Sequence, residues 1–237
     1  MDRADSEAGT EAGTRRVVRH CLVATVAAVA LMGLWSAVVN SAMPTGAAVP
    51  IHWNAAGEAD GFASKGFALT LMPATALGIG LLLALIPVLD PRKRHIAQSM
   101  GFLRTTWLAL LLFFLVLHLA MGLLYLGWAV PMDRVVITSV GGLFVVLGNL
   151  LGKVRSNFFM GVRTPWTLSS EYTWTKTNRA TGRVMVGGGV AIAICGALWG
   201  GGPAMAATML TVGAILIVAV GYSYAVWRTA PDRAGSD

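Results

Sequence analysis

The chain has 237 residues, of which 56% are hydrophobic and only 12% charged, so a disordered chain and a soluble enzyme of this length are both excluded. Its two cysteines exclude a disulfide scaffold. Its net charge of +7 first indicates membrane topology and contact with anionic lipid, and we expect no direct binding of nucleic acid.

Six apolar segments are long enough to cross a membrane. They are residues 17–39, 67–89, 105–128, 135–151, 184–200 and 204–227. About 20 helical residues cross a hydrocarbon core of roughly 30 Å, and a span must be helical because lipid offers no hydrogen-bond partner to the backbone. The fourth and fifth segments have 17 residues each, so we expect their ends to extend into the flanking sequence. The pattern predicts an all-α polytopic membrane bundle of six transmembrane helices.

The domain organisation follows from these spans. Residues 1–16 form a polar tail, residues 17–95 a two-span N-terminal domain, and residues 96–237 a four-span domain. Sixteen of the 18 Lys and Arg residues fall on the side of the two termini, and only Lys65 and Arg134 fall on the other. The positive-inside rule therefore predicts that both termini are cytoplasmic.

The loop over residues 40–66 is expected on the outer side. Prolines favour extended backbone there, and residues 51–53 are consistent with a short strand or an interfacial segment. His52, Glu58 and Asp60 are candidates for a metal or proton site, but their spacing matches no standard set of metal ligands. The alternative is a folded cap that places Trp53 and Phe62 at the lipid interface.

The loop over residues 152–183 is expected on the inner side. Pro165 breaks any helix, and Ser169 or Ser170 can cap a new one with Glu171 in its first turn. That helix would place Trp174 and Asn178 on one face. A stripe of cations follows on this helix: Lys176, Arg179 and Arg183.

Two interpretations of the inner loop remain open. In the first, it carries a juxtamembrane amphipathic helix whose cations meet anionic lipid and whose tryptophans lie at headgroup depth. In the second, Arg155 and Arg163 bind the carboxylates of a protein partner or a phosphate.

Two polar residues lie within the predicted spans, where polar side chains are costly. His118 is near the middle of the third span and Asn149 near the inner end of the fourth. His118 either pairs with a neighbouring helix or, with Asn149 and Arg155, lines the path of a small-solute transporter or channel. The chain has no nucleophile elbow, phosphate loop, zinc-protease helix or CxxC pair. We therefore expect no enzyme, no cofactor and no metal. A membrane enzyme that acts on lipid or peptide with His52 and Asp60 as acid and base would lack a nucleophile.

The two loops together resemble the SdpI family, bacterial multi-span proteins named for an immunity protein against a secreted killing peptide. The inner loop carries the more specific part of the resemblance, in these residues: Gly148, Asn149, Gly152, Lys153, Arg155, Asn157, Gly161, Arg163, Thr164, Pro165, Trp166, Thr167, Leu168, Trp174 and Thr177. The outer loop is similar to the N-terminal domain of unknown function that often precedes this family, in these residues: Pro50, Ile51, His52, Trp53, Asn54, Gly57, Asp60, Gly61, Ser64 and Lys65.

The resemblance implies a multi-pass protein of the bacterial cytoplasmic membrane that gives resistance to a membrane-active toxin peptide. It also implies a signalling role, in which the protein holds a cytoplasmic transcriptional repressor at the membrane. The residues that we expect to bind a ligand or partner are His52, Asn54, Gly57, Asp60, Asn149, Arg155, Asn157, Gly161, Arg163, Thr164, Trp166 and Trp174. The family commonly has His where this chain has Asn178, and Asn cannot titrate, so we expect no proton- or metal-dependent role at that position.

Overall fold

The computed structural model describes residues 3–54, 56–89 and 97–233, and it consists of long helices with one short hairpin. Its elements are α1 (Arg3–Ala42), β1 (Ala48–Trp53), β2 (Ala59–Ser64), α2 (Lys65–Leu89), α4 (Met100–Tyr125), α5 (Met132–Leu151), α6 (Pro165–Ser169), α7 (Glu171–Leu198), α8 (Gly201–Ile217), a π-helical turn (Val218–Tyr222), α9 (Ser223–Arg228) and a 3-10 turn (Pro231–Arg233). Within the described part of the chain, six helices are long and apolar enough to cross a membrane, the last being Gly201–Arg228. The prediction of an all-α polytopic bundle is confirmed.

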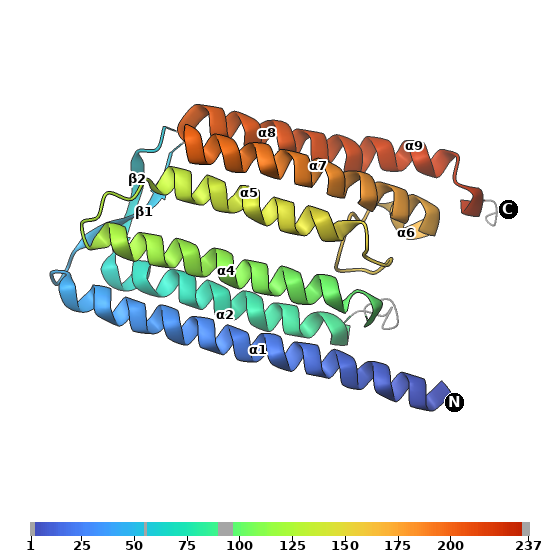
Figure 1. Ribbon diagram of the computed structural model, residues 1–237, viewed down its shortest axis with the longest axis horizontal. Helices are drawn as coiled ribbons and strands as arrows, with labels where there is room; N and C mark the ends of the chain where they lie inside the picture. The colour runs from blue at the N-terminus through green and yellow to red at the C-terminus, as the bar shows by residue number, and fades with distance from the viewer. Residues whose placement is uncertain (1–2, 55, 90–96, 234–237) are drawn as a thin grey trace.

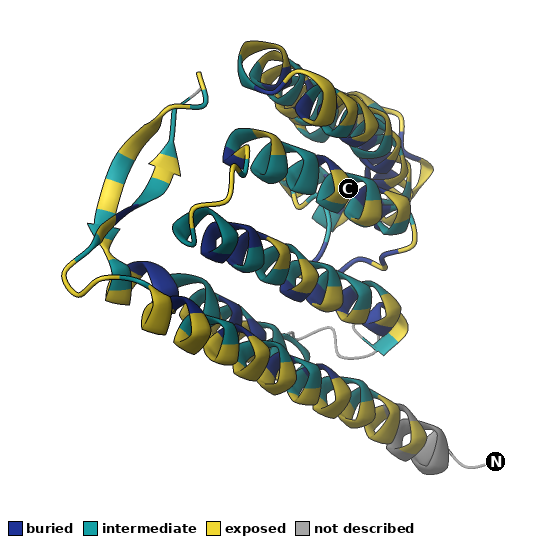
Figure 2. Ribbon diagram, turned by 60° about the vertical axis from the view of Figure 1, so that its left-hand side comes forward, coloured by how far each residue is buried: buried dark blue, intermediate teal, exposed yellow. Residues whose placement is uncertain are grey.

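The long helices lie side by side, almost in chain order (Figure 1). Helices α1, α2 and α4 contact one another, α4 contacts α5, and α5 packs most extensively against α7, which also contacts α8. Apolar side chains on the outer faces are exposed, among them Val88, Leu210 and Ile217 (Figure 2). Such faces suit lipid, which solvates apolar side chains as well as a protein core does.

Helices α5 and α7 approach closely because glycines face each other along their contact. A Cβ on Gly148 would lie 2.7 Å from the carbonyl oxygen of Gly182, and one on Gly141 would lie 2.6 Å from that of Gly189. Any larger residue at these positions would push the two backbones apart. The glycines thus fix the position of α7, which carries much of the site described below.

The bundle has two distinct ends. We call the end with β1 and β2 the hairpin end; α5 and α8 begin there. We call the opposite end, with residues 152–164 and α6, the loop end. The two strands pair antiparallel, with irregular register around His52.

Two predicted boundaries differ from those observed. The fifth span begins at Glu171 and continues the helix that Ser170 caps, so residues 171–183 of the predicted inner loop are part of α7. The predicted connection between the second and third spans lies partly at residues 90–96, outside the described residues, and α4 begins at Met100. The polar N-terminal segment is helical from Arg3 and continuous with the first span.

Candidate functional site

The loop that follows α5 is folded around the buried amide of Asn157. Its side-chain oxygen accepts hydrogen bonds from the backbone N–H groups of Phe159, at 2.9 Å, and Met160, at 2.7 Å. Its side-chain nitrogen donates to the carbonyl oxygen of Arg155 at 2.7 Å. One side chain therefore satisfies three backbone groups of an irregular segment, which otherwise lacks partners for them.

Helix α7 holds the other side of this loop. The indole N–H of Trp174 donates to the carbonyl oxygen of Val154 at 2.7 Å. The side-chain oxygen of Asn178 accepts from the backbone N–H of Val162 at 2.8 Å, and its nitrogen donates to the carbonyl of Trp174 at 3.0 Å. Gly161, with φ +99°, leaves room for both, because a Cβ there would lie 2.7 Å from the Asn178 oxygen.

These contacts correct one interpretation of the inner loop. Trp174 is only 1% exposed and packs with Met100, Leu103 and Met160. Its side chain is therefore enclosed in the protein core and does not face lipid headgroups. The prediction that Trp174 and Asn178 share one face of a helix is confirmed.

Residues 164–170 connect the loop to two helices. Thr164 and Thr167 form a reciprocal capping box at the start of α6, with backbone N–H to hydroxyl distances of 3.2 and 2.9 Å. The Thr164 hydroxyl also lies 3.3 Å from that of Ser223, and the rings of Trp166 and Tyr224 lie 5.1 Å apart. The predicted site residues Thr164 and Trp166 thus attach α6 to the last span.

The first turn of α7 is closed by Ser170 and by a residue near the C-terminus. The Ser170 hydroxyl accepts from the backbone N–H of Thr173 at 3.0 Å and donates to the carboxylate of Asp232 at 2.6 Å. The backbone N–H of Tyr172 donates to the same carboxylate at 3.1 Å. The bond from Ser170, which outweighs partial burial, and the bond from Tyr172 lower the pKa of Asp232. Sequence reasoning missed Asp232, because nothing in its neighbourhood shows that it lies beside Ser170.

The two arginines of the inner loop have different surroundings. The Arg163 guanidinium donates to the carbonyl oxygen of Phe158 at 2.6 Å and so closes the loop on itself. Arg155 uses its backbone N–H, which donates to the Ser99 hydroxyl at 3.1 Å. Its side chain is exposed, and no described residue pairs with its guanidinium. Of the two, only Arg155 has its charged group free for a partner.

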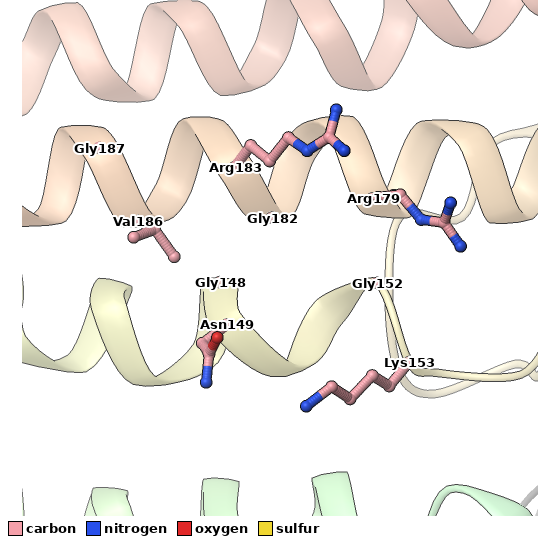
Figure 3. Close-up of a pocket in the computed structure, with 9 residues that line it drawn as sticks. All are labelled: Gly148, Asn149, Gly152, Lys153, Arg179, Gly182, Arg183, Val186 and Gly187. Carbon is pink, nitrogen blue, oxygen red and sulfur yellow. The ribbon is translucent and has the colours of Figure 1, made fainter.

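Asn149 lies apart from that loop, in a groove of about 720 Å³ between α5 and α7. The groove is also lined by Lys153 from the loop that follows α5 and by Arg179 and Arg183 from α7 (Figure 3). It includes neither His118 nor Arg155. The three residues of the transport hypothesis therefore do not share this groove.

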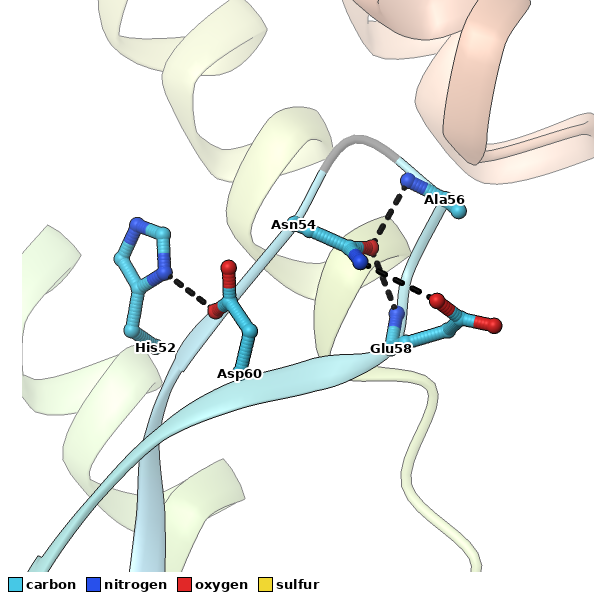
Figure 4. A network of polar contacts seen from close by, with 5 residues as sticks. All are labelled: His52, Asn54, Ala56, Glu58 and Asp60. Atoms are coloured by element: carbon cyan, nitrogen blue, oxygen red, sulfur yellow. Dashed lines mark hydrogen bonds and ion pairs between the residues drawn. The ribbon is translucent and has the colours of Figure 1, made fainter.

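At the hairpin end, His52 and Asp60 form an exposed hydrogen-bonded pair (Figure 4). The imidazole Nδ1 lies 2.6 Å from a carboxylate oxygen of Asp60. Their side chains are 71% and 44% exposed. Glu58 is not part of this pair and instead accepts from the Asn54 amide at 3.1 Å. Among the described residues, no three His, Cys, Asp or Glu side chains come together to hold a metal ion.

Asn54 shapes the turn between the strands. Its side-chain oxygen accepts from the backbone N–H groups of Ala56, at 2.9 Å, and Glu58, at 3.0 Å. Gly57 follows with φ +84°, and a Cβ there would lie 3.2 Å from the carboxyl carbon of Asp133. Asp133, at the start of α5, also accepts from the backbone N–H of Gly201 at 3.3 Å. It thereby connects the turn to α8, a role that sequence reasoning missed.

The hairpin covers the end of the bundle. The Tyr125 hydroxyl donates to the carbonyl oxygen of Pro50 at 2.8 Å. Ile51 and Trp53 pack against the cluster of Ala120, Met121 and Met132. Trp53 thus belongs to the contact between hairpin and helices, whereas Phe62 is 61% exposed. The folded cap is observed, with only Phe62 of its two aromatic residues turned outward.

His118 is buried where three helices meet. Its Nε2 lies 3.0 Å from the Ser36 hydroxyl and 3.1 Å from the carbonyl oxygen of Met32. Ser36 donates its own proton to the carbonyl of Leu69 at 2.9 Å, so it accepts from His118. Both contacts therefore require that Nε2 carries the proton. His118 joins α4 to α1, and through Ser36 to α2, as expected for a histidine paired with neighbouring helices.

Two segments of the chain match models of known protein families. Residues 153–223 match the model of the SdpI/YfhL protein family, and residues 26–77 match the domain of unknown function DUF1648. The resemblance to the SdpI family is confirmed. The chain is 29% identical over 146 residues to the immunity protein SdpI of Bacillus subtilis (strain 168). The aligned region covers 62% of this chain and 68% of that protein. No solved structure matches the chain.

The SdpI-family segment coincides with the densest hydrogen bonding at the loop end. It contains Asn157, Gly161, Trp174 and Asn178, whose contacts fold the loop against α7. The DUF1648 segment contains the whole hairpin, including His52 and Asp60. The family pattern thus falls on one structured element at each end of the bundle.

Proposed function

We propose that this protein is an integral membrane immunity protein that protects its bacterial host against a membrane-active toxin peptide. The observation that carries the proposal is the identity of 29% over 146 residues with the immunity protein SdpI. The multi-pass fold supports it, because a protein in the same bilayer as the toxin can meet the peptide where it acts.

The hairpin end faces outward in this proposal. Among the Lys and Arg residues that the structure describes, only Lys65 and Arg134 fall at that end, and the positive-inside rule then favours a cytoplasmic loop end. The location is the bacterial cytoplasmic membrane. A secreted peptide would meet the hairpin first.

The outer face of the hairpin carries the contact with the toxin. His52, Asp60 and Phe62 are all exposed, and Asp60 and Phe62 point to one face because they are two residues apart in β2. An acidic group beside an aromatic ring suits an amphipathic peptide with cationic and apolar side chains. Asn54 and Gly57 shape the turn and act on this contact indirectly.

The loop end serves mainly as the rigid base of the bundle, with one group directed to a partner. Asn157, Gly161, Arg163, Thr164, Trp166 and Trp174 all make contacts inside the molecule. The exposed guanidinium of Arg155 is the group that would bind a carboxylate of a cytoplasmic transcriptional repressor.

A survival assay tests the outer contact. Cells lacking the gene receive the intact protein, the His52→Ala variant, the Asp60→Asn variant or the Phe62→Ser variant, and are challenged with killing peptides secreted by neighbouring strains. Thr45→Ala is the matched control, because Thr45 is exposed in the same loop but lies outside both strands of the hairpin. Membrane insertion is measured for every variant.

We expect the intact protein and Thr45→Ala to protect, and the three face variants to lose protection while still inserting. Protection by all three face variants would refute the role of this face. An intact protein that protects against none of the peptides would refute immunity and leave the fold unaffected. For the repressor, a photo-crosslinker at position 155 should capture a cytoplasmic protein that one at exposed position 176 does not; equal capture would contradict the role of Arg155.

A further inference from the structure

The groove between α5 and α7 contains cations that nothing in the described part of the chain neutralises. Lys153, Arg179 and Arg183 are all exposed along it. The Arg15–Glu11 ion pair and the His52–Asp60 hydrogen bond, both among the described residues, lie elsewhere. Three unpaired cations on one groove favour an anionic ligand.

The groove changes character along its length. Lys153 and Arg179 lie at its loop end, and Val186 and Gly187 lie at its other end, toward the middle of the span (Figure 3). From Arg179 to Gly187 the helix rises roughly 12 Å. The charged and apolar ends of the groove are therefore separated by about the distance between the phosphate of a phospholipid and the first part of its acyl chain.

Glycines make the groove accessible. Gly148 and Gly182 bring α5 and α7 together at its floor, and Gly187 leaves open space at its apolar end, where an added Cβ would meet nothing within 4 Å. Asn149 adds a neutral amide that can donate to an oxygen at the charged end. Because the groove is on exposed faces of two membrane-crossing helices, it opens toward the surrounding lipid.

We propose that this groove binds one phospholipid with an anionic headgroup, and that the flexible side chains of Lys153, Arg179 and Arg183, which point in different directions in Figure 3, turn toward this headgroup while an acyl chain lies along Val186 and Gly187. The proposal does not depend on immunity. It differs from general attraction of a basic protein to an anionic membrane, because it requires a defined stoichiometry and particular cations. The same cations could also bind free inorganic phosphate. Only a phospholipid would make the additional contact through its acyl chain, so that contact distinguishes the two ligands.

The experiment titrates the purified full-length protein in detergent with phosphatidylglycerol, or with phosphatidylcholine of the same acyl chains, and counts bound lipid by native mass spectrometry. The groove variant carries Lys153→Gln, Arg179→Gln and Arg183→Gln. The matched control carries Arg16→Gln, Arg19→Gln and Arg104→Gln, which removes the same charge from exposed positions outside the groove. The unfolding temperature of each protein shows that it is folded.

We expect one phosphatidylglycerol molecule to bind the native protein in preference to phosphatidylcholine. The groove variant should bind it about a hundredfold more weakly, since each cation near a membrane surface contributes about fivefold. The control should bind it as the native protein does. An equal loss in both variants, or no loss in the groove variant, would overturn the proposal.

A second variant tests the acyl contact without changing any charge. Gly187→Leu should fill the apolar end of the groove and weaken phosphatidylglycerol binding, and inorganic phosphate should not displace the lipid. If inorganic phosphate displaces the lipid and Gly187→Leu has no effect, the ligand is a free phosphate and the lipid proposal is wrong.

Discussion

Asn157 shows how one side chain can determine the shape of an irregular loop. Replacing it with Ala would leave two backbone N–H groups and the carbonyl of Arg155 without their partner in a buried or partly buried place. We expect Asn157→Ala to lower the free energy of unfolding by roughly 2–4 kcal/mol, because each unpaired buried polar group costs about 1–3 kcal/mol and the loop relaxes in part. Thermal unfolding of the purified protein in detergent measures this. Arg155→Ala is the control, and an equal loss of stability there would contradict the role of Asn157.

The backbone conformation of Gly161 provides a second test of how this loop is folded. Its φ of +99° is unfavourable for other residues, and a Cβ would lie 3.0 Å from the Trp174 ring. We expect Gly161→Ala to destabilise the protein by about 2 kcal/mol or more. Gly142→Ala, in the exposed interior of α5 with open space around it, should instead be neutral or stabilising by up to about 1 kcal/mol. Unfolding curves that coincide for the two variants would refute this account.

Only part of what the structure shows for these residues could be predicted from the sequence. The four-residue spacing placed Trp174 and Asn178 on one face, as observed. Their burial could not be predicted, because their partners are the backbone groups of Val154 and Val162, which are the same whatever the side chains are. The functional roles of the loop residues remain predictions, and their positions now indicate support of the loop more than direct binding.

At the scale of elements, the start of α7 depends on a contact with the C-terminal turn. Asp232 accepts the hydrogen bonds from Ser170 and Tyr172 more strongly as a carboxylate than as a neutral acid, and these bonds lower its pKa below 3.8, the ordinary value. Its stabilising effect is therefore complete above the ordinary pKa and is lost as the pH falls through the lowered value.

We expect Asp232→Asn to lower the unfolding temperature by a few degrees at neutral pH, because the neutral amide is a weaker acceptor than the carboxylate. The difference from the native protein should shrink as the pH falls through the lowered pKa of Asp232. Unfolding temperatures of both proteins across the acidic range measure it. A difference that stays constant down to the most acidic pH would show that the charge of Asp232 has no part in this contact.

Elements differed in how well the sequence predicted them. Long apolar runs predicted all six spans, because a membrane helix satisfies its own backbone and needs no partner to be recognised. A short strand at residues 51–53 was only one of two interpretations, and its pairing with β2 was not predicted, since the two strands have weak strand patterns of their own. The early start of α7 was predicted as a capped helix but not as part of the fifth span, because its first turns are polar.

At the scale of the whole molecule, the orientation of the bundle decides which end a secreted peptide can reach. Ser64 lies at the hairpin end and Ser169 at the loop end, and three spans separate them. Both are exposed, so a cysteine at either position is accessible to a reagent in the adjoining compartment. The native Cys21 and Cys195 are replaced by Ala to leave one thiol in each protein.

We expect a membrane-impermeant thiol reagent to label Ser64→Cys in intact cells and to label Ser169→Cys only after the membrane is permeabilised. The reason is the energetic preference for retaining Lys and Arg in the cytoplasm, with 16 of the 18 on the side that the sequence assigns to the cytoplasm. The reverse pattern would place the hairpin in the cytoplasm and exclude it as the contact for a secreted toxin. Labelling of both positions in intact cells would mean that an even number of spans separates them, which would contradict the six-span bundle itself.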